Sequence, residues 1–206
     1  MFSEYITEIK ASLDRLPVHQ VQHVVDTIIS AWQRNQQIFI IGNGGSASTA
    51  SHMACDLSKN TANVDAPRLR VMSLNDNMAL FSAYSNDNGY ENVFAEQLKN
   101  FVNRGDILVA ISASGNSKNI LKAIRLANSM GAITIGWSGY DGGELAQIAQ
   151  IPLVVPSHNI ERIEDIHLML EHMVTVAVRD AMATSQLEAP MIMPLAEVLE
   201  LSPFLQ

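Results

Sequence analysis

The segment Asp106-Ile-Leu-Val-Ala-Ile-Ser-Ala-Ser-Gly-Asn-Ser117 joins an apolar run to a turn of small polar residues. The run is rich in β-branched residues and predicts a buried strand over 107–111. Apolar residues at helical spacing follow the turn and predict a helix over 118–130, with Gly131 in the position that ends it. A strand, a short polar turn and a helix in this order are the repeating unit of an α/β protein.

Three hydroxyl groups make this turn a candidate anion site. The first N–H groups of a helix have no partners inside the helix, and the helix dipole adds partial positive charge at the same end. Ser112, Ser114 and Ser117 can donate further hydrogen bonds to phosphate oxygens, while Gly115 lets the backbone approach a ligand closely. The alternative is an ordinary strand-to-helix turn in which Ser117 only caps the helix.

The same alternation of elements extends along the chain on both sides of this turn. Further strands are expected over 37–42, 69–74, 132–137 and 151–155. Helices are expected over 3–16, 19–34, 47–59, 78–85, 91–101, 144–149 and 161–183. We therefore predict an α/β fold: a single doubly wound domain with a five-stranded, mostly parallel sheet, an N-terminal helical pair and a long C-terminal helix. Residues 1–184 would form this domain, followed by an apolar C-terminal tail over 185–206.

The amino-acid composition argues against some classes of binding partner and favours self-association. The formal net charge of -8, with 13 Lys plus Arg, argues against nucleic acid and against an anionic membrane surface. Hydrophobic residues make up 48% of the chain and charged residues only 17%, so we expect an oligomer that buries surface between subunits. The absence of a long apolar run and of a signal-peptide pattern predicts a cytoplasmic protein. The single cysteine, Cys55, fits a reducing compartment and is expected to be a small core residue.

A second polar turn, Gly42-Asn-Gly-Gly-Ser46, follows the first predicted strand. It lacks the G-x-G-x-x-G spacing, which disfavours a dinucleotide. The carboxyl ends of parallel strands meet at one edge of the sheet, so Asn43, Gly44 and Ser46 should face the serine-rich turn. Two such turns suit a phosphorylated polyol, because one can hold the phosphate while the other meets hydroxyl groups.

Two predicted helices carry ionisable residues at suggestive spacings. His52 and Asp56 are four residues apart, so they share a helix face and can bind a divalent metal or divide acid and base roles. On the last helix, Glu164, His167 and Glu171 lie closest to one face, which favours His167 over His172 as the partner of Glu164. The alternatives are a solvated pair on the first helix and a solvated charged stripe on the last.

Taken in order, these motifs make the chain resemble the sugar isomerase (SIS) domain and, within it, the phosphoheptose isomerases. The resemblance runs from about residue 20 to residue 183. It is carried by G-N-G-G-S at 42–46, His52 with a carboxylate at 56, Asn86-Asp87, I-S-A-S-G-N-S at 111–117, G-Y-D-G-G at 139–143, and R-I-E-D-I-H at 162–167 followed by His172.

The resemblance implies an activity and an assembly. Such enzymes are cytoplasmic homotetramers with a central bundle of N-terminal and last helices and with sites at subunit interfaces. They convert sedoheptulose 7-phosphate into a heptose 7-phosphate, the first step of heptose biosynthesis for surface glycans. The chemistry is an aldose-ketose isomerisation through an enediol, in which one group moves the carbon-bound proton and a second moves the hydroxyl proton.

The resemblance also implies roles for individual residues. Ser112, Ser114 and Ser117 would hold phosphate, while Asn43, Gly44, Ser46, Asp87 and Glu164 would help to bind the substrate. The implied zinc ligands are His52, Asp56, Glu164 and His172, so His172 replaces His167 as the expected partner of Glu164. Asp56 would be the base at carbon and His172 its proton-transfer partner.

Three departures from the family pattern leave alternatives open. Asp56 stands where a catalytic glutamate is usual, Glu164 stands where a glutamine is common, and Ala113 replaces a hydroxyl residue. A non-catalytic SIS module that binds a sugar phosphate is therefore one alternative. A tetrameric partner protein of the replication-initiator-associating type is another. Retention of His52, Asp56, Glu164 and His172 favours the enzyme.

Overall fold

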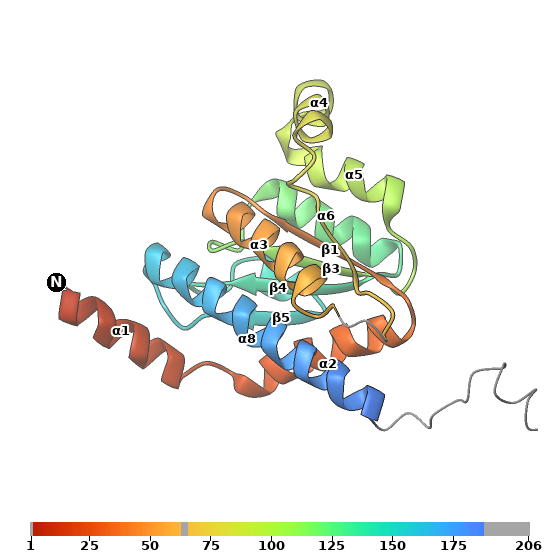
Figure 1. Ribbon diagram of the computed structural model, residues 1–206. Helices are drawn as coiled ribbons and strands as arrows, with labels where there is room; N and C mark the ends of the chain where they lie inside the picture. Colours follow the sequence, from red (N-terminus) through yellow and green to blue (C-terminus); the bar gives the residue numbers. More distant parts are fainter. Residues whose placement is uncertain (1, 63–65, 188–206) are drawn as a thin grey trace, which may run out of the picture.

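The computed structural model describes residues 2–62 and 66–187 and is built around one parallel sheet (Figure 1). The strands lie in the order β2-β1-β3-β4-β5, and every neighbouring pair is parallel. They are β1 (Gln37–Gly42), β2 (Arg70–Ser73), β3 (Ile107–Ile111), β4 (Ile133–Ser138) and β5 (Ile151–Val154). The predicted five-stranded α/β fold is confirmed, and Pro152 lies in an edge strand as its missing N–H requires.

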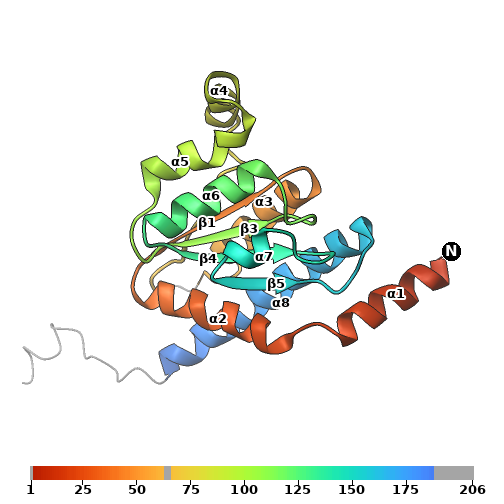
Figure 2. The ribbon, with the colours of Figure 1, turned by 180° about the vertical axis from the view of Figure 1, so that it is seen from behind.

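Helices cover both faces of the sheet (Figures 1 and 2). One face carries α2 (Val18–Gln33), α3 (Gly45–Lys59) and α8 (Ile160–Leu187). The other carries α5 (Val93–Phe101), α6 (Lys118–Ser129) and the short α7 (Leu145–Ile148). Two more helices, α1 (Phe2–Asp14) and α4 (Met78–Asn88), extend away from this body.

Alternation along the central strands divides the core into two layers. In β1, Ile38 and Ile40 pack under α2, α3 and α8, whereas Phe39 and Ile41 pack under α5 and α6. All four side chains are fully buried. The strands are therefore apolar on both faces, which is typical of a parallel sheet covered by helices on each side.

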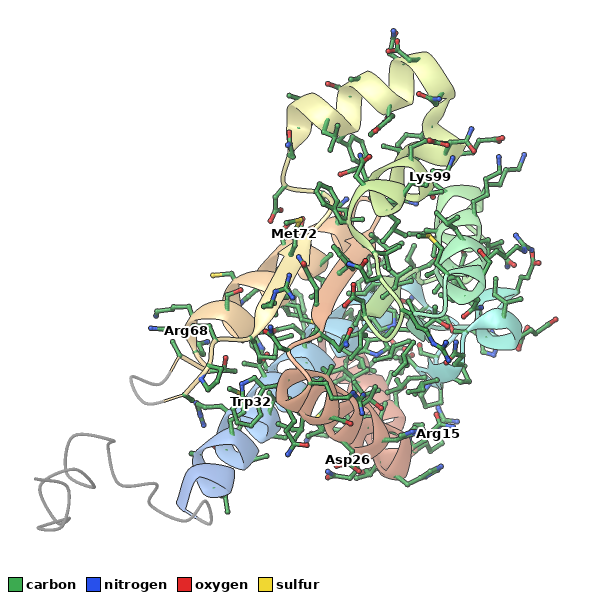
Figure 3. The ribbon with its side chains drawn as sticks, turned by 90° about the vertical axis from the view of Figure 1, so that its right-hand side faces the viewer. Arg15, Asp26, Trp32, Arg68, Met72 and Lys99 are labelled. Atoms are coloured by element: carbon green, nitrogen blue, oxygen red, sulfur yellow. The ribbon has the colours of Figure 1, made fainter. Side chains whose placement is uncertain are left out.

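Hydrogen bonds tie the chain that enters β2 to α2 and to the segment that follows α2; Figure 3 labels Trp32 of α2. Trp32 lies near the end of α2, and its Nε1–H donates a hydrogen bond to the carbonyl oxygen of Pro67 (2.8 Å). Arg70 of β2 donates from its guanidinium group to the carbonyl oxygen of Asn35 (2.9 Å). These bonds hold the chain that enters β2 against the helix that precedes β1.

Several element boundaries differ from those predicted. The polar stretch 85–89 was expected to be a turn, but α4 continues to Asn88, and Gly89 (φ +83) leads into a 3-10 helix over Tyr90–Asn92. The helix α8 ends at Leu187, past the predicted limit at 183 and the proposed domain boundary at 184. Residues 188–206 of the predicted tail lie outside the described residues. None of the helices in the described ranges combines the length and apolar character that spanning a bilayer requires.

Cys55 is exposed, so the expectation of a buried cysteine is wrong. The residues of α3 that enter the core are Ser46, Thr49, Ala50, Met53, Ala54 and Leu57. Cys55 follows Ala54 by about 100° around the helix, which is enough to carry its thiol out of that narrow stripe. Helical periodicity alone does not show which residues at the edge of the buried stripe of α3 face the core.

Candidate active site

The loop Ser112–Ser117, hereafter the serine loop, connects β3 to α6 at the carboxyl end of the sheet. Ser112 is buried and its Oγ donates to Ser117 Oγ (3.3 Å). Ser117 stands immediately before α6, yet its side chain does not cap the N–H groups of that helix. Ser117 thus occupies the N-cap position that the alternative gave it but makes no side-chain capping hydrogen bond, which leaves N–H groups at the start of the helix available to a ligand.

Gly115 gives the serine loop its shape. It adopts φ +65, and a Cβ built there would lie 2.1 Å from the carbonyl oxygen of Gly142. A neighbouring residue strengthens the same contact, because Asn116 Oδ1 accepts a hydrogen bond from the N–H of Glu144 (3.0 Å). The serine loop is thus packed tightly against the turn after β4, as a pre-formed ligand site requires.

The serine loop and the loop after β1 face a shared hollow of about 160 Å³. Its walls are Asn43, Ser46, Ile111, Ser112, Ala113, Ser114, Ser117, Ile160 and Glu164. This placement agrees with the expectation that the two polar turns meet at one crevice. Gly44 is the N-cap residue of α3, with φ +54, and is not among the described walls of the hollow. The carboxylate of Glu164 lies against Gly45, where a Cβ would come within 2.8 Å of both carboxylate oxygens.

Two residues that the sequence had not singled out hold Asn43 in place. Asn43 and Asn119 exchange amide hydrogen bonds of 2.9 and 2.8 Å, and Tyr90 donates its hydroxyl to Asn43 Oδ1 (2.7 Å). Asn119 is 2% exposed, and an asparagine at a buried position near a helix start was the available signal. Asp87 does not border the hollow within the described structure and instead accepts a hydrogen bond from Asn86 (2.8 Å).

A second polar group, hereafter the histidine–carboxylate cluster, joins α3 to α8. It consists of His52, Asp56, Glu171 and His172, whose potential ligand atoms all lie within 4.8 Å of one another. His52 Nε2 is 3.6 Å from Asp56 Oδ2, and His172 Nε2 is 3.3 Å from Glu171 Oε2. The structure thus brings together three of the four predicted metal ligands, but it places Glu164 in the hollow and Glu171 in the cluster.

Glu171 differs from the other members of the cluster in its burial. Its side chain is fully buried, whereas those of His52 and His172 are 43% and 51% exposed. Thr175 donates its hydroxyl to Glu171 Oε1 (3.1 Å), and Oε2 has no hydrogen-bond partner among the described residues. Burial raises the pKa of Glu171, an effect that the neighbouring His172 opposes.

His167 is a core residue, so the geometric preference for it as the partner of Glu164 is wrong. It is 1% exposed, lies beside the Trp137 ring and contacts the carbonyl oxygen of Ser138 through Nε2 (3.3 Å). Burial lowers the pKa of His167 to about 4. The helix face that carries His167 is turned towards β4, which the sequence could not specify.

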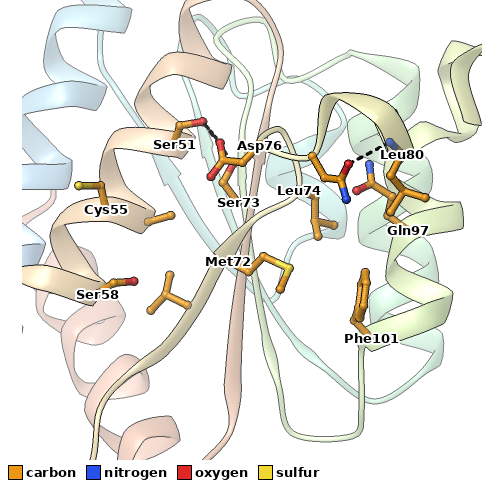
Figure 4. Close-up of a pocket in the computed structure, with 13 residues that line it drawn as sticks. Ser51, Cys55, Ser58, Met72, Ser73, Leu74, Asp76, Leu80, Gln97 and Phe101 are labelled. Atoms are coloured by element: carbon orange, nitrogen blue, oxygen red, sulfur yellow. Dashed lines mark hydrogen bonds between the residues drawn. The ribbon is translucent and has the colours of Figure 1, made fainter. Parts of the chain in front are cut away.

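A larger hollow, of about 570 Å³, lies beside the edge strand β2 (Figure 4). Cys55, Met72 and Phe101 are among its walls, and Ser51 donates to Asp76 across its rim (2.5 Å). Apart from Gly44 and Asp87, the predicted site residues line the smaller hollow or belong to the histidine–carboxylate cluster instead. Residue chemistry, not volume, therefore identifies the site.

Comparison with known proteins shows which family the chain is similar to. The model of the SIS domain family matches residues 2–139. A phosphoheptose isomerase of Clostridium acetobutylicum is 36% identical over 157 residues, which cover 76% of this chain and 80% of the relative. One from Helicobacter pylori is 37% identical over 164 residues, covering 80% and 84%. The solved phosphoheptose isomerase of Neisseria gonorrhoeae superposes with a TM-score of 0.80 at 28% identity, covering 87% of this chain and 95% of the other.

Proposed function

The chain belongs to the SIS-domain family and, within it, to the phosphoheptose isomerases, and we propose that it interconverts sedoheptulose 7-phosphate and a heptose 7-phosphate. The reaction is an aldose-ketose isomerisation, so a proton must leave one carbon and return to its neighbour. The substrate would lie with its phosphate in the serine loop and its reacting carbons at the histidine–carboxylate cluster.

The arrangement of α3 and α8 is the observation that carries this proposal. Glu164 of α8 meets Gly45 at the start of α3, and His172 meets His52 further along the same two helices. Gly45 and His52 are seven residues apart, which is about 10 Å along a helix. A phosphate site and an ionisable site at that separation suit a long sugar phosphate that is held at one end and transformed at the other.

The phosphate would be held mainly by neutral donors. Ser112, Ser114 and Ser117 offer hydroxyls, and the start of α6 offers backbone N–H groups and the positive end of its dipole. Asn43 and Ser46, on the opposite wall, face the hydroxyl groups of the sugar.

We propose zinc as the cofactor because the donor set fits it. Two imidazoles and carboxylates are ordinary zinc ligands, and a buried carboxylate oxygen in the histidine–carboxylate cluster has no hydrogen-bond partner in the described structure. His52, Asp56 and His172 would hold the ion. When bound, zinc would supply Lewis-acid stabilisation of the negative charge that develops on the substrate oxygen.

Proton transfer would be the work of this chain's own side chains. Asp56 is 17% exposed and would remove the carbon-bound proton, while the more exposed His172 would move the hydroxyl proton. Asp56 is one methylene shorter than the glutamate usual in the family, so the substrate must lie closer to α3. The rate of the reaction would therefore depend on how precisely the serine loop positions the phosphate end of the substrate.

A homotetramer in the cytoplasm completes the proposal. Phe2 and Ile6 of α1 and the apolar side chains Met169 and Met173 of α8 are exposed, which is expected of surfaces that pack against other subunits. The helix α1 contacts α8, where Tyr5 donates to Asp165 (2.5 Å) and Arg162 pairs with Glu8. A second copy packed on these two helices would border the histidine–carboxylate cluster, and sedimentation velocity would give the number of copies.

The test is isomerisation of sedoheptulose 7-phosphate by the purified protein, with bound metal measured by atomic emission. His172→Ala should lower kcat by at least about 100-fold, because it removes a proton-transfer group. Ser114→Ala should weaken substrate binding about tenfold without loss of metal, whereas Ser129→Ala, on the far end of α6, should change neither. Absence of turnover by the wild-type protein on this substrate would refute the proposal.

A further inference from the structure

We propose that the apolar segment 188–206 docks in the larger hollow beside β2, hereafter the β2 hollow, of the same chain. Residues of α3, β2, α4 and α5, and of the loop between β2 and α4, form the walls of the β2 hollow (Figure 4). Neither the isomerisation nor the metal enters into this docking.

The walls of the β2 hollow carry apolar side chains that the described structure leaves uncovered. Met72 and Phe101 are each 38% exposed. No residue of α4 is buried within the described structure, and Leu80 of this helix is among the walls. β2 is also an edge strand of the sheet, and proteins commonly cover such edges with another segment. The β2 hollow is therefore an apolar surface of the kind that marks an interaction site.

The polar side chains in the walls are engaged with the protein itself. Ser51 donates to Asp76 (2.5 Å), and Asn77 Oδ1 accepts the N–H of Leu80 (3.1 Å) (Figure 4). Gln97 donates to a carbonyl oxygen of its own helix (3.2 Å). A small polar ligand depends on polar groups that converge on it, whereas these groups are bonded to one another or to the backbone. An apolar occupant therefore suits the β2 hollow.

The segment after α8 has the composition of such an occupant. It reads E-A-P-M-I-M-P-L-A-E-V-L-E-L-S-P-F-L-Q over 188–206, with large apolar residues throughout and glutamates as its only charged residues. Two exposed cations border the β2 hollow: Lys59 follows the wall residue Ser58, and Arg68 precedes β2 (Figure 3). Docking would remove the apolar side chains from water, and the opposite charges would favour the approach.

The end of α8 lies within reach of the β2 hollow. Glu164 lies against Gly45 at the start of α3, and the two histidines of the histidine–carboxylate cluster meet further along both helices. The helices therefore run in the same direction and end on the same side of the molecule, with α8 continuing about 12 Å past α3 (Figure 1). The nineteen residues after α8 can span up to about 60 Å, which is ample for a return past the end of α3 to Ser58.

Cys55 provides the test, because it lines the β2 hollow and is the only cysteine of the chain. Its rate of reaction with a water-soluble aromatic disulfide is measured in the full chain, with folding checked by circular dichroism. The triple-serine variant combines Leu195→Ser, Leu199→Ser and Phe204→Ser. It should react at least about tenfold faster than the wild type, because the β2 hollow is then open to the reagent.

Two controls separate docking from a general change in the protein. Ala189→Ser combined with Ala196→Ser adds hydroxyl groups to the same segment but removes no large apolar side chain, so Cys55 should react at the wild-type rate. A Ser129→Cys reporter in a Cys55→Ser background lies at an exposed position of α6, outside the walls of the β2 hollow. This reporter should react equally fast with and without the triple-serine substitutions.

Met72→Gln probes the wall of the β2 hollow. It makes an exposed apolar wall position polar and should speed the reaction of Cys55 about threefold. In the triple-serine variant the same substitution should have no further effect, because the β2 hollow is already open. Met130→Gln, at a similarly exposed position outside the walls, should leave the rate unchanged. A full effect of Met72→Gln in the triple-serine variant would contradict docking of the segment on this wall.

The rates of the wild type and the triple-serine variant decide whether the segment docks. Equal rates would overturn the proposal, because the β2 hollow would then be open in both proteins or filled by something other than segment 188–206. Mixed assemblies identify the chain that supplies the segment. They are formed by coexpressing Cys55→Ser chains, which keep the wild-type segment, with triple-serine chains, which keep Cys55. Fast reaction in these assemblies supports docking within one chain, whereas slow reaction would overturn it in favour of a segment from another copy.

Discussion

Replacement of His167 by glutamine should reduce the loss of unfolding free energy that the wild type shows as the pH is lowered. The imidazole is buried against Trp137, and its Nδ1 has no hydrogen-bond partner in the described ranges. Protonation would place a charge at that nitrogen, so burial lowers the pKa of His167 from 6.5 to about 4. Glutamine cannot be protonated and can still donate to the carbonyl oxygen of Ser138.

The sign and size of the effect follow from the two pKa values. The folded state binds the proton more weakly than the unfolded state, so stability is fully present above pH 6.5 and is lost as the pH falls towards about 4. At about 1.4 kcal/mol per unit of pKa difference, the complete loss is about 3 kcal/mol. Between about pH 7.5 and pH 5 the expected loss is about 2 kcal/mol.

The assay is urea unfolding of metal-free protein, followed by circular dichroism and by tryptophan fluorescence at one fixed protein concentration. The free energy of unfolding of the wild type should fall by about 2 kcal/mol more than that of His167→Gln over this pH range. His19→Gln, at an exposed position of α2, should behave as the wild type. Parallel profiles for wild type and His167→Gln would refute the assignment of His167 as a neutral core residue.

Three further substitutions probe the site and its support. Gly115→Ala should lower the unfolding free energy by at least about 2 kcal/mol, because a Cβ would meet the carbonyl oxygen of Gly142; a wild-type denaturation midpoint would contradict this. Asp106→Asn should cost about 2 kcal/mol, since its carboxylate accepts two backbone N–H groups (2.8 and 2.7 Å), and an unchanged midpoint would count against it. Asn119→Ala should lower kcat/KM about tenfold by freeing Asn43, and unchanged kinetics would show that this amide pair does not orient the site.

The fold was predictable because its signals are local. Apolar runs such as 107–111, each bounded by a polar turn, define strands that are buried on both faces. The positions of the turns follow from residues such as Gly131, which adopts φ +79 after α6 as predicted. One exception is α4, whose end at Asn88 was missed because a run of serine, asparagine and aspartate residues is typical of turns.

The serine loop was also predictable, since its chemistry is contiguous in the sequence. Hydroxyls, a glycine and a helix start lie within six residues, and their neighbours in space are largely neighbours in the chain. Asn119 and Tyr90 were missed for the opposite reason. Each acts only through Asn43, which is distant in sequence and is brought near by the packing of separate elements.

The sequence alone could not assign the ionisable residues of α8 to their separate environments. A helical projection places Glu164, His167 and Glu171 near one face, but it cannot say how far along a partner helix each one lies. The packing of α8 beside α3 resolves them into three environments: Glu164 in the hollow of the serine loop, His167 in the core and Glu171 in the histidine–carboxylate cluster. Residues that share a face of one helix can therefore lie in three different environments, because about 10 Å of axial rise separates the first of them from the last. Single substitutions along this one helix can then be used to perturb the hollow, the core and the cluster one at a time.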